Sequence, residues 1–434
     1  MTGPSVLLED AVEMLLDHRG KTPKKLGTDW ADAGVQVVSA KLISDGRLNL
    51  DRERRYVDEA TYARWMPVKL RRGDVLLTSE APLGEAAMVD TDAPLVLGQR
   101  LFALRARPGV ADTRYLYYLF RSPVGRDLLA QRGSGTTVVG IRQSELRKVP
   151  LPLPSVKIQG RTADVLGSLD ELIKNNRRRI ELLEQMAQAI YREWFVHFRY
   201  PGHEDDDLVD SDLGPIPAGW EAARAHQLVA AGVLEIGDGY RAKNAEMTDS
   251  GLPFVRVASV RDGRLDLTDC DHLPLSYAAR LKGKASQPAD TVICMKGTVG
   301  RSAFVHAELP KLAYSPQVSY WRSLDHDVIA PSYVYSWIRS DDFRRQCGAV
   351  KGATDMADYV NLRDQRLMQL LRPSAAIMSA FNGCAEPTIR LAGTLLSQVE
   401  RLAATRDLLL PKLVTGEIDV SELDLDTLVE AASA

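Results

Sequence analysis

The sequence predicts an α+β protein built as a tandem duplication of two globular domains, each followed by a long helix, with the two helices pairing as an antiparallel coiled coil. Three observations predict this fold. Four sequence blocks occur twice in the same order. Each copy ends at a proline-containing segment that precedes a helical stretch. Both helical stretches carry a heptad pattern, which requires a partner helix.

The repeat is the observation that fixes the domain organisation. DGRL is identical in the first pair of blocks, and the offset between copies drifts only from 216 to 219 residues. Such a period is far too long for a solenoid. The matching pairs are SAKLISDGRL (39–48) with RVASVRDGRL (256–265), GDVLLTSEAPLGEAAMV (73–89) with ADTVICMKGTVGRSAFV (289–305), TRYLYYLFRS (113–122) with PSYVYSWIRS (331–340), and IRQSELRKVPLPLPS (141–155) with VNLRDQRLMQLLRPS (360–374).

Each copy opens with short apolar runs typical of strands, VQVV and DVLL in the first and PFVRVASV and TVICM in the second, separated by Gly and Asp-Gly turns. The aromatic stretches YLYYLFRS and YVYSWIRS have helical spacing and are expected in the core. The prolines in VPLPLP and RP fix an extended entry to each long helix. The predicted domains are a first target domain 1–153, a central spacer helix 154–200, an acidic linker 201–219, a second target domain 220–373, a C-terminal spacer helix 374–416 and an acidic tail 417–434.

The heptad seam of the first helix recurs in the second at an offset of 219 residues, with weak positions at Thr388 and Arg406. Each helix of roughly 40 residues would be about 60 Å long. Asn176 is either a polar residue that fixes the register of the pair or a gap in the seam. The predicted seam residues are Leu169, Ile173, Asn176, Ile180, Leu183, Ala187, Ile190 and Trp194 in the first helix, and Ala392, Leu395, Val399, Leu402, Leu409 and Leu413 in the second.

The charges are distributed unevenly. Residues 1–150 carry a net charge of +4 and residues 220–373 of +2, whereas the linker 201–219 carries −6 and residues 374–434 carry −5. Two mildly basic domains permit a DNA surface on each. The linker PGHEDDDLVDSDLGPIPAGW is expected to be exposed and extended. The Arg177–Arg179 run is compatible with a nucleic-acid contact, a solvated face or a docking site for an acidic partner.

Location and cysteine chemistry follow from composition. Neither a membrane-spanning apolar run nor a signal-peptide pattern is present. The four cysteines are far apart and form no CxxC pair, which predicts reduced thiols and no metal site. We therefore expect a cytoplasmic protein.

No catalytic constellation was found. The sequence lacks GxGxxG, HExxH and GxSxG patterns, and it lacks the Asp/Asn-Pro-Pro-Tyr segment of amino-methyltransferases. The seven histidines form no i, i+3 or i, i+4 pair. A duplicated chain of this kind is better interpreted as a binding scaffold with two similar modules.

The central segment VPLPLPSVKIQGRTADVLGSLDELIKNNRRRIELLEQMAQAIYREWFVHF resembles the central region of the specificity subunits of type I restriction–modification enzymes. LLLPKLVTGEIDVSEL (408–423) resembles the C-terminal signature of the same family, and GDVLLTSEAPLG and DGRL fit its target-recognition domains. The resemblance covers essentially the whole chain. Gly160 and Arg161 depart from the usual Lys-Arg, and the second helix is the more divergent one.

The resemblance implies a non-catalytic chain whose two target-recognition domains each read one half of a bipartite, asymmetric double-stranded DNA sequence. The helices would set the spacing and dock methyltransferase subunits, two of them in our expectation, and through these the restriction subunits. S-adenosylmethionine, ATP and Mg²⁺ would be bound by these partners. Two alternatives are a stand-alone DNA-binding scaffold without methylase partners and an enzyme with a cryptic nuclease or methyltransferase site.

Candidate DNA contacts are the basic and polar residues of predicted loops, because Lys and Arg bind phosphates while Arg, Lys, Asn and Gln read base edges. For each of them a solvated surface role is the alternative. Ile141 and Leu146 are expected in the core instead. The candidates are Lys21, Lys24, Lys25, Arg52, Arg54, Arg55, Thr136, Thr137, Arg142 and Gln143 in the first domain, and Tyr240, Arg241, Lys243, Asn244, Lys296, Arg301, Lys351, Thr354 and Asn361 in the second.

Overall fold

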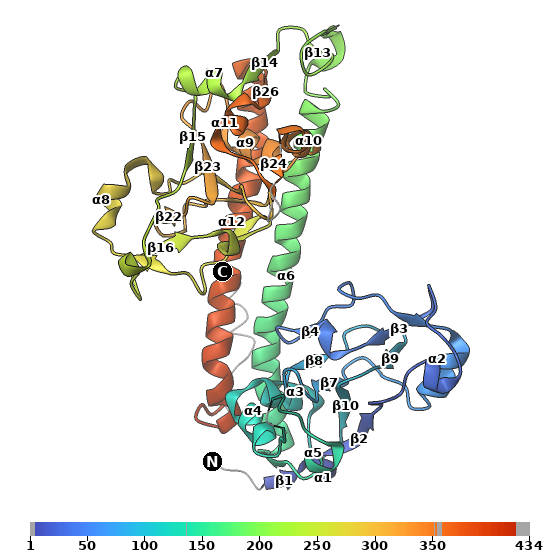
Figure 1. Ribbon diagram of the computed structural model, residues 1–434. Helices are drawn as coiled ribbons and strands as arrows, with labels where there is room; N and C mark the ends of the chain where they lie inside the picture. Colours follow the sequence, from blue (N-terminus) through green and yellow to red (C-terminus); the bar gives the residue numbers. More distant parts are fainter. Residues whose placement is uncertain (1–4, 136, 351, 354–357, 422–434) are drawn as a thin grey trace. The chain divides into compact units, whose positions relative to one another are not determined.

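The computed structural model of the chain describes residues 5–135, 137–350, 352–353 and 358–421. They form two compact units (Figure 1): unit 1 comprises Met1–Ile173 and Arg401–Ala434, and unit 2 comprises Lys174–Glu400. The boundaries between the units fall inside the two long helices. The predicted α+β class is confirmed, with a helix-flanked sheet in each unit.

Unit 1 begins with a target domain and continues into the first long helix. Its strands are β1 (Ser5–Leu7), β2 (Val12–Asp17), β3 (Val35–Val38), β4 (Ile43–Ser44), β5 (Arg47–Leu48), β6 (Tyr56–Val57), β7 (Val75–Thr78), β8 (Ala86–Met88), β9 (Leu95–Leu97), β10 (Leu101–Ala106) and β11 (Pro150–Pro152). Its helices are α1 (Leu8–Ala11), α2 (Glu59–Trp65), α3 (Thr113–Arg121), α4 (Pro123–Ala130), α5 (Gln143–Leu146) and the start of α6 (Val156–Phe195), with 3-10 turns at Lys24–Leu26 and Ala40–Leu42.

Unit 2 contains the second target domain and the start of the second long helix. Its strands are β12 (Leu208–Val209), β13 (Ile216–Pro217), β14 (Glu221–Arg224), β15 (Leu234–Asp238), β16 (Leu252–Val255), β17 (Val260–Arg261), β18 (Arg264–Leu265), β19 (His272–Leu273), β20 (Thr291–Cys294), β21 (Ser302–Phe304), β22 (Ala313–Tyr314), β23 (Val318–Ser323), β24 (Gly352–Ala353), β25 (Asp358–Tyr359) and β26 (Gln369–Arg372). Its helices are α7 (Ala225–Ala230), α8 (Tyr277–Leu281), α9 (Pro331–Ile338), α10 (Asp341–Val350), α11 (Leu362–Leu367) and α12 (Ala375–Thr415), with 3-10 turns at His203–Asp205, Asn244–Glu246, Val257–Ser259 and Lys282–Lys284.

The sheet topology repeats in the two units, which confirms the internal duplication. A four-stranded sheet has the order β2-β10-β7-β8 in unit 1 and β15-β23-β20-β21 in unit 2. A three-stranded sheet has the order β6-β3-β9 and then β19-β16-β22. In both three-stranded sheets the central strand pairs antiparallel with one neighbour and parallel with the other. The antiparallel pairs are β3–β6 and β16–β19, and the parallel pairs are β3–β9 and β16–β22.

The four-stranded sheet of unit 1 separates two apolar cores. Phe102 and Leu104 of β10 lie in one core with α3 and the start of α6, whereas Leu101 and Ala103 lie in the other with the three-stranded sheet. This alternation follows from the two-residue period of a strand. In unit 2, Trp321 of β23 faces the helix side in the same way. The predicted core helices YLYYLFRS and YVYSWIRS are indeed buried.

Each target domain carries a buried ion pair across neighbouring central strands. In unit 1, Arg105 Nε lies 2.7 Å from Asp74 Oδ1. In unit 2, Arg322 Nε lies 2.7 Å from Asp290 Oδ1, and both side chains are almost fully buried. Asp290 also accepts hydrogen bonds from Tyr314 Oη and the backbone of Gln287, so that its charge is compensated despite its burial.

The two long helices pair in antiparallel fashion. Within unit 1, Asp170 of α6 contacts Arg406 of α12, with 2.8 Å between Oδ1 and Nη1. Within unit 2, Asn176 Nδ2 donates to Gln398 Oε1 over 3.2 Å, and Ala187 packs in one cluster with Ile389. Rising residue numbers on α6 therefore meet falling numbers on α12. Arg406, a weak position of the predicted seam, has a charged partner.

The predicted seam residues differ in burial. Those that are buried are Ile173, Asn176, Ile180, Ala187, Ala392, Leu395, Val399 and Leu413, whereas Leu169, Leu183, Ile190, Trp194, Leu402 and Leu409 are half-buried. The ends of the helices lie in the apolar cores of the units: Phe195 packs in unit 2 and Val414 in unit 1.

The prediction of an extended linker at 201–220 is wrong. β12 pairs with β13 as a hairpin, Ile216 is buried, and the Tyr200 and Trp220 rings stack with 5.0 Å between centroids. Tyr200 also hydrogen-bonds Asp206. Apolar side chains at both ends of the acidic stretch therefore fold it onto the unit, which a composition argument does not detect.

The segment after α12 returns to unit 1. Gly416 ends the helix with a φ of 73°, a value that glycine adopts without strain. Val420 is then buried in the core, and its carbonyl accepts a hydrogen bond from Arg161 Nη1 over 3.2 Å. Within the described part of the chain, no helix is long and apolar enough to cross a membrane.

Candidate nucleic-acid interface

Three equivalent loops occur in each unit. Loop I follows β2 or β15 (residues 18–27 and 239–247), and loop II follows β7 or β20 (79–85 and 295–301). Loop III precedes α5 or α11, with described residues 132–135 and 137–142 in unit 1 and 352–353 and 358–361 in unit 2. Loop I contains a 3-10 turn in both units, at Lys24–Leu26 and at Asn244–Glu246. The duplication has therefore preserved the loops as well as the sheets.

Loops II and III are joined by the same backbone bonds in the two units. Gly140 forms an isolated bridge with Glu80 in unit 1, and Tyr359 forms one with Lys296 in unit 2. Ile141 N–H donates to the Ser79 carbonyl over 2.9 Å, and the equivalent bond from Val360 N–H reaches Met295 over 3.0 Å. These bonds hold the two loops at the end of the central sheet.

Loop I joins loop III through Arg19 in unit 1, whose Nη1 lies 3.0 Å from the Ile141 carbonyl oxygen. His18, at the start of this loop, is buried, and burial lowers its pKa to about 4, with a further contribution from nearby Lys21. The positive charge of loop I at neutral pH therefore comes from Arg19, which pairs with Asp17, and from its lysines, of which Lys24 and Lys25 are exposed.

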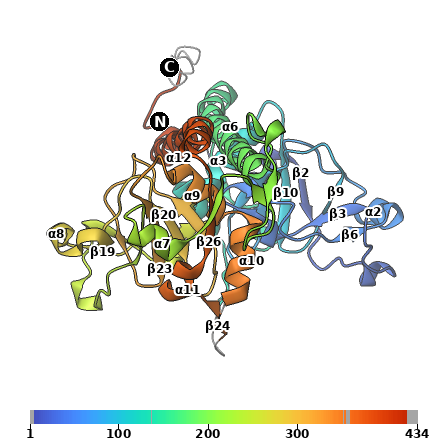
Figure 2. The same cartoon turned by 90° about the horizontal axis from the view of Figure 1, so that it is seen from above.

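In unit 2, Glu246 organises loop I. Its carboxylate accepts hydrogen bonds from the Lys243 backbone N–H (2.7 Å) and from the hydroxyls of Tyr240 (3.0 Å) and Tyr277 (3.2 Å). The backbone hydrogen bond and the two hydroxyls, opposed by partial desolvation, lower the pKa of this carboxyl. The side chains of Arg241, Lys243 and Asn244 are left exposed on the outer side of the loop. In Figure 2, β24 of loop III lies on the side of unit 2 opposite α12.

The comparisons with known proteins agree on one family. The profile described as Type I restriction modification DNA specificity domain matches residues 6–185. The type I restriction enzyme MjaIX specificity subunit of Methanocaldococcus jannaschii is 26% identical over 410 residues, covering 93% of this chain and 91% of that protein. The EcoBI specificity subunit of Escherichia coli is 21% identical over 292 residues, covering 62% of this chain and 57% of that protein.

Residues 6–185 of the chain thus match the model of type I DNA specificity domains, and over most of its length the chain is similar to specificity subunits of type I restriction enzymes. A solved structure of the S subunit of a type I restriction–modification system from M. genitalium shares the fold, with a TM-score of 0.57 and 14% identity, covering 94% of this chain and 95% of that one. The relatives are named as specificity subunits, and the expectation that this chain has no active site of its own stays a prediction.

The structure places the predicted contact residues in different settings. The loop residues with exposed side chains are Lys24, Lys25, Thr137, Arg142, Arg241, Lys243, Asn244 and Lys296. Thr136, Lys351 and Thr354 lie outside the described residues. Gln143 is half-buried and donates to the Leu15 carbonyl over 3.5 Å. No contact with DNA is visible, and the assignment of these residues stays a prediction.

Four further predicted loop residues make internal hydrogen bonds. Lys21 Nζ donates to the Trp65 carbonyl (3.0 Å), and Arg301 Nη1 donates to the Val260 carbonyl (3.1 Å). Asn361 caps α11 by accepting from the Asp364 backbone N–H. Tyr240 donates to Glu246, as described above. These side chains hold their loops in place, a role that sequence reasoning cannot distinguish from DNA contact.

The basic segment RERR lies between β5 and β6, outside the three loops. Arg54 pairs with Asp51 (2.7 Å) and Arg55 with Glu53 (2.9 Å), whereas the exposed Arg52 makes no such pair among the described residues. The Arg55 guanidinium also lies over the ring of the exposed Trp30, 5.4 Å from its centroid. Surface pairs of this kind are weak and can exchange for phosphate.

Sequence reasoning missed a pair of residues that faces loop II in both units. Arg100 and Gln317 occupy equivalent positions just before β10 and β23, and both side chains are exposed. The Arg100 carbonyl accepts a hydrogen bond from the Ser79 backbone N–H, and the Gln317 carbonyl accepts the equivalent bond from the Met295 backbone N–H. The 217-residue offset aligns them and could have revealed them. Val138, half exposed in loop III, was also missed.

Proposed function

We propose that this chain is the specificity subunit of a type I restriction–modification enzyme and that it reads a bipartite, asymmetric double-stranded DNA target, with loops I–III of each unit contacting one half-site. The carrying observation is that both units join loops II and III by equivalent backbone bonds and place loop I after the equivalent strand, while the exposed side chains on these loops differ. The shared scaffold accounts for two similar modes of docking, and the different side chains account for two different half-sites.

The chemistry of the exposed side chains supports this division of roles. Lys24 and Lys25 of unit 1 and Lys243 of unit 2 offer mobile ammonium groups that suit phosphates. Arg100 carries a guanidinium that suits the acceptor edge of guanine, and Gln317 an amide that suits adenine. The two equivalent positions would therefore favour different bases, as an asymmetric target requires.

Docking of methyltransferase subunits on the long helices forms the second part of the proposal. Leu182 and Met186 lie one turn apart on α6 with about half of each side chain exposed (42% and 54%), and Leu408 of α12 is 63% exposed. Exposed apolar side chains on otherwise polar helix faces are typical of interaction surfaces. The internal repeat supports two methyltransferase subunits, with restriction subunits recruited through them.

On this proposal, S-adenosylmethionine belongs to the methyltransferase subunits and ATP with Mg²⁺ to the restriction subunits. The chain itself would supply the target and the placement of the methyl group. The deciding experiment is methylation of a genomic library by the purified chain together with methyltransferase subunits, followed by single-molecule sequencing of methylated adenines. We expect one bipartite motif with two unlike halves. A single contiguous motif, or modification without sequence preference, would contradict the proposal.

The loops themselves are tested by salt-dependent binding to that target. Replacing Lys24 and Lys25 by Gln should weaken binding and reduce the slope of log affinity against log salt by about 0.9 for each lost phosphate contact. Lys157, exposed near the start of α6 and outside the loops, provides a matched control. An equal effect of Lys157→Gln would place the DNA elsewhere on the molecule.

A further inference from the structure

An arginine and a tyrosine one helical turn apart recur on the core helix of both units. In unit 1, Arg121 Nη1 donates to Tyr117 Oη over 2.7 Å at the end of α3. In unit 2, Arg339 Nη1, just after α9, donates to Tyr335 Oη over 2.6 Å. The offset of 218 residues makes the two pairs equivalent. All four side chains are largely buried, so that these guanidinium groups require a carboxylate.

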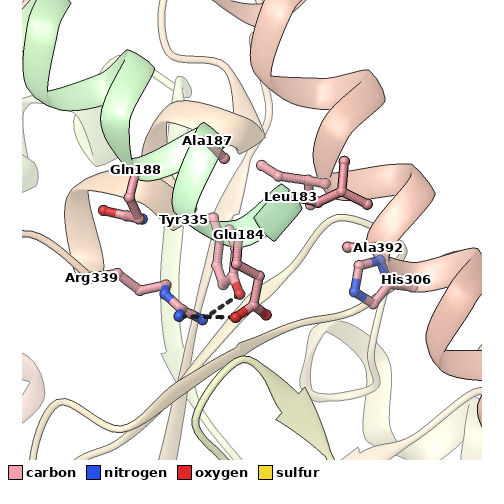
Figure 3. A pocket seen from close by; sticks show the side chains of 9 residues that line it. Leu183, Glu184, Ala187, Gln188, His306, Tyr335, Arg339 and Ala392 are labelled. Atoms are coloured by element: carbon pink, nitrogen blue, oxygen red, sulfur yellow. Dashed lines mark hydrogen bonds and ion pairs between the residues drawn. The ribbon is translucent and has the colours of Figure 1, made fainter. Parts of the chain in front are cut away.

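In both units that carboxylate comes from α6. Asp170 Oδ2 lies 3.3 Å from Arg121 Nη1 in unit 1. Glu184 Oε2 lies 3.4 Å from Arg339 Nη2 in unit 2, beside a cavity of about 10 Å³ (Figure 3). Such a cavity has room for about one water molecule. Neither acid is repeated on α12. At the 219-residue offset, Asp170 corresponds to Ile389 and Glu184 to Ala403.

The arginine–tyrosine pair also touches the repeated Asp-Gly turn. Gly46, between β4 and β5, has a φ of 74°, and its carbonyl accepts a hydrogen bond from Tyr117 Oη over 3.0 Å. A Cβ atom added to Gly46 would lie 2.5 Å from Arg121 Cζ. A Cβ atom added to Gly263, between β17 and β18, would lie 2.4 Å from Glu184 Oε1. Only glycine permits this approach of the hairpin to the ion pair.

In unit 1 the contacts run from the α6 carboxylate through arginine and tyrosine to the hairpin of the target domain. In unit 2 the arginine reaches the hairpin directly, with 3.9 Å between Arg339 Nη1 and Asp262 Oδ1. A guanidinium presents its donors in a rigid fork, so that bonds to two partners fix direction as well as distance. In unit 1 the Asp170 carboxylate has two arginine partners. Its Oδ1 accepts from Arg406 of α12, and its Oδ2 lies near Arg121.

We propose that Arg121 and Arg339 are positioning residues for target reading: each fastens its target domain, beside the Asp-Gly hairpin, to a carboxylate of α6 and so helps to set the placement of that domain. The inference rests on the proposed function, because placement matters only if each domain reads a half-site. It assigns the spacing of the half-sites to two named contacts on one helix.

The test uses the complete methyltransferase complex and three DNAs: the target found by sequencing, and the same half-sites brought one base pair closer or moved one base pair apart. The measured quantity is the ratio of kcat/KM for the native spacing to that for the altered spacings. R121Q and R339Q should lower this ratio about tenfold, as expected for loss of a charge-assisted hydrogen bond. A residue that only stabilises the fold would reduce the amount of active complex and leave the ratio unchanged.

R406Q is the matched control in unit 1, because it removes the α12 partner of Asp170 and leaves the Arg121 contact. E181Q, which removes an exposed α6 carboxylate paired with Arg178, is the control near Glu184. Both should keep the wild-type ratio. If R121Q fails to assemble, Y117F replaces it, since it removes only the hydroxyl that joins Arg121 to Gly46.

An unchanged ratio in R121Q and R339Q, or a fall in R406Q as large as in R121Q, would overturn the inference. A wild-type complex without any sequence preference would instead refute the proposed function, so that the two failures are distinguishable.

Discussion

Asn176 lies at the centre of the helix pair. Replacing it by leucine should make the pair more stable and its register less well defined. The side chain is 8% exposed, and its Nδ2 atom bonds Gln398 Oε1 at 3.2 Å. Losing this bond costs about 1 kcal/mol. Burying a leucine there returns about 1.5–3 kcal/mol. Because Gln398 is half-buried and keeps access to water, we expect a net gain of about 1 kcal/mol.

Register is the property that the asparagine should protect. Sliding the helices by one heptad moves one past the other by about 10 Å. In the native sequence this slip leaves the Asn176 amide unpaired among apolar side chains, at a cost of about 1–3 kcal/mol. In N176L that cost disappears, and slipped pairings become populated.

The assay is a distance distribution between spin labels at Glu181→Cys on α6 and Arg390→Cys on α12, two exposed positions of unit 2. Cys270 and Cys384, the cysteines that are not buried, are replaced by serine. We expect one narrow distance in the native helix pair and a second, shifted population in N176L. Hydrogen exchange in residues 174–190 measures the stability locally, since two units need not unfold together. One narrow distance in N176L would show that apolar packing sets the register and that Asn176 is only a gap in the seam.

Three further predictions concern unit stability. Asp290→Ala leaves the buried Arg322 guanidinium with only the more exposed Glu235 as its carboxylate partner and should lower the free energy of unfolding of unit 2 by about 2–3 kcal/mol, measured in urea through tryptophan fluorescence; a loss below 1 kcal/mol would contradict this. Burial lowers the pKa of His306 to about 4 against a weaker opposing effect of Glu308, so the unfolded state binds more protons than the folded state between pH 6.5 and 4. The free energy of unfolding of unit 2 should therefore fall by about 3 kcal/mol as the pH is lowered over that range, and H306Q should not show this fall. Val420→Ser should cost unit 1 about 2 kcal/mol, visible as faster exchange at the start of α6.

Much of the fold could be predicted from the sequence, because its signals are local or repeated. The duplication was evident from DGRL and the constant offset, and the structure repeats strand order and loops accordingly. The heptad pattern predicted the two long helices, and the globular block that follows the first of them favoured antiparallel pairing. The burial of Ile141 and Leu146 was also predicted correctly.

The site was less predictable, because a basic residue in a loop has the same sequence signature whether it faces solvent, DNA or its own backbone. Lys21 and Lys24 belong to one basic segment, yet Lys21 bonds the Trp65 carbonyl and Lys24 is exposed. The prediction for the linker was wrong for a related reason. Its acids indicated an extended chain, whereas the Trp220 ring stacks on Tyr200 and brings the two ends of the segment together.

By itself the sequence determined the duplication, the helix pair and the family, since each depends on patterns along the chain. Only the tertiary structure decided which residues meet: that α6 supplies the carboxylates for both Arg121 and Arg339, and that Asn176 finds Gln398. Such contacts join residues 49 to 222 positions apart. They depend on the direction of side chains in packed helices, which a one-dimensional pattern does not contain.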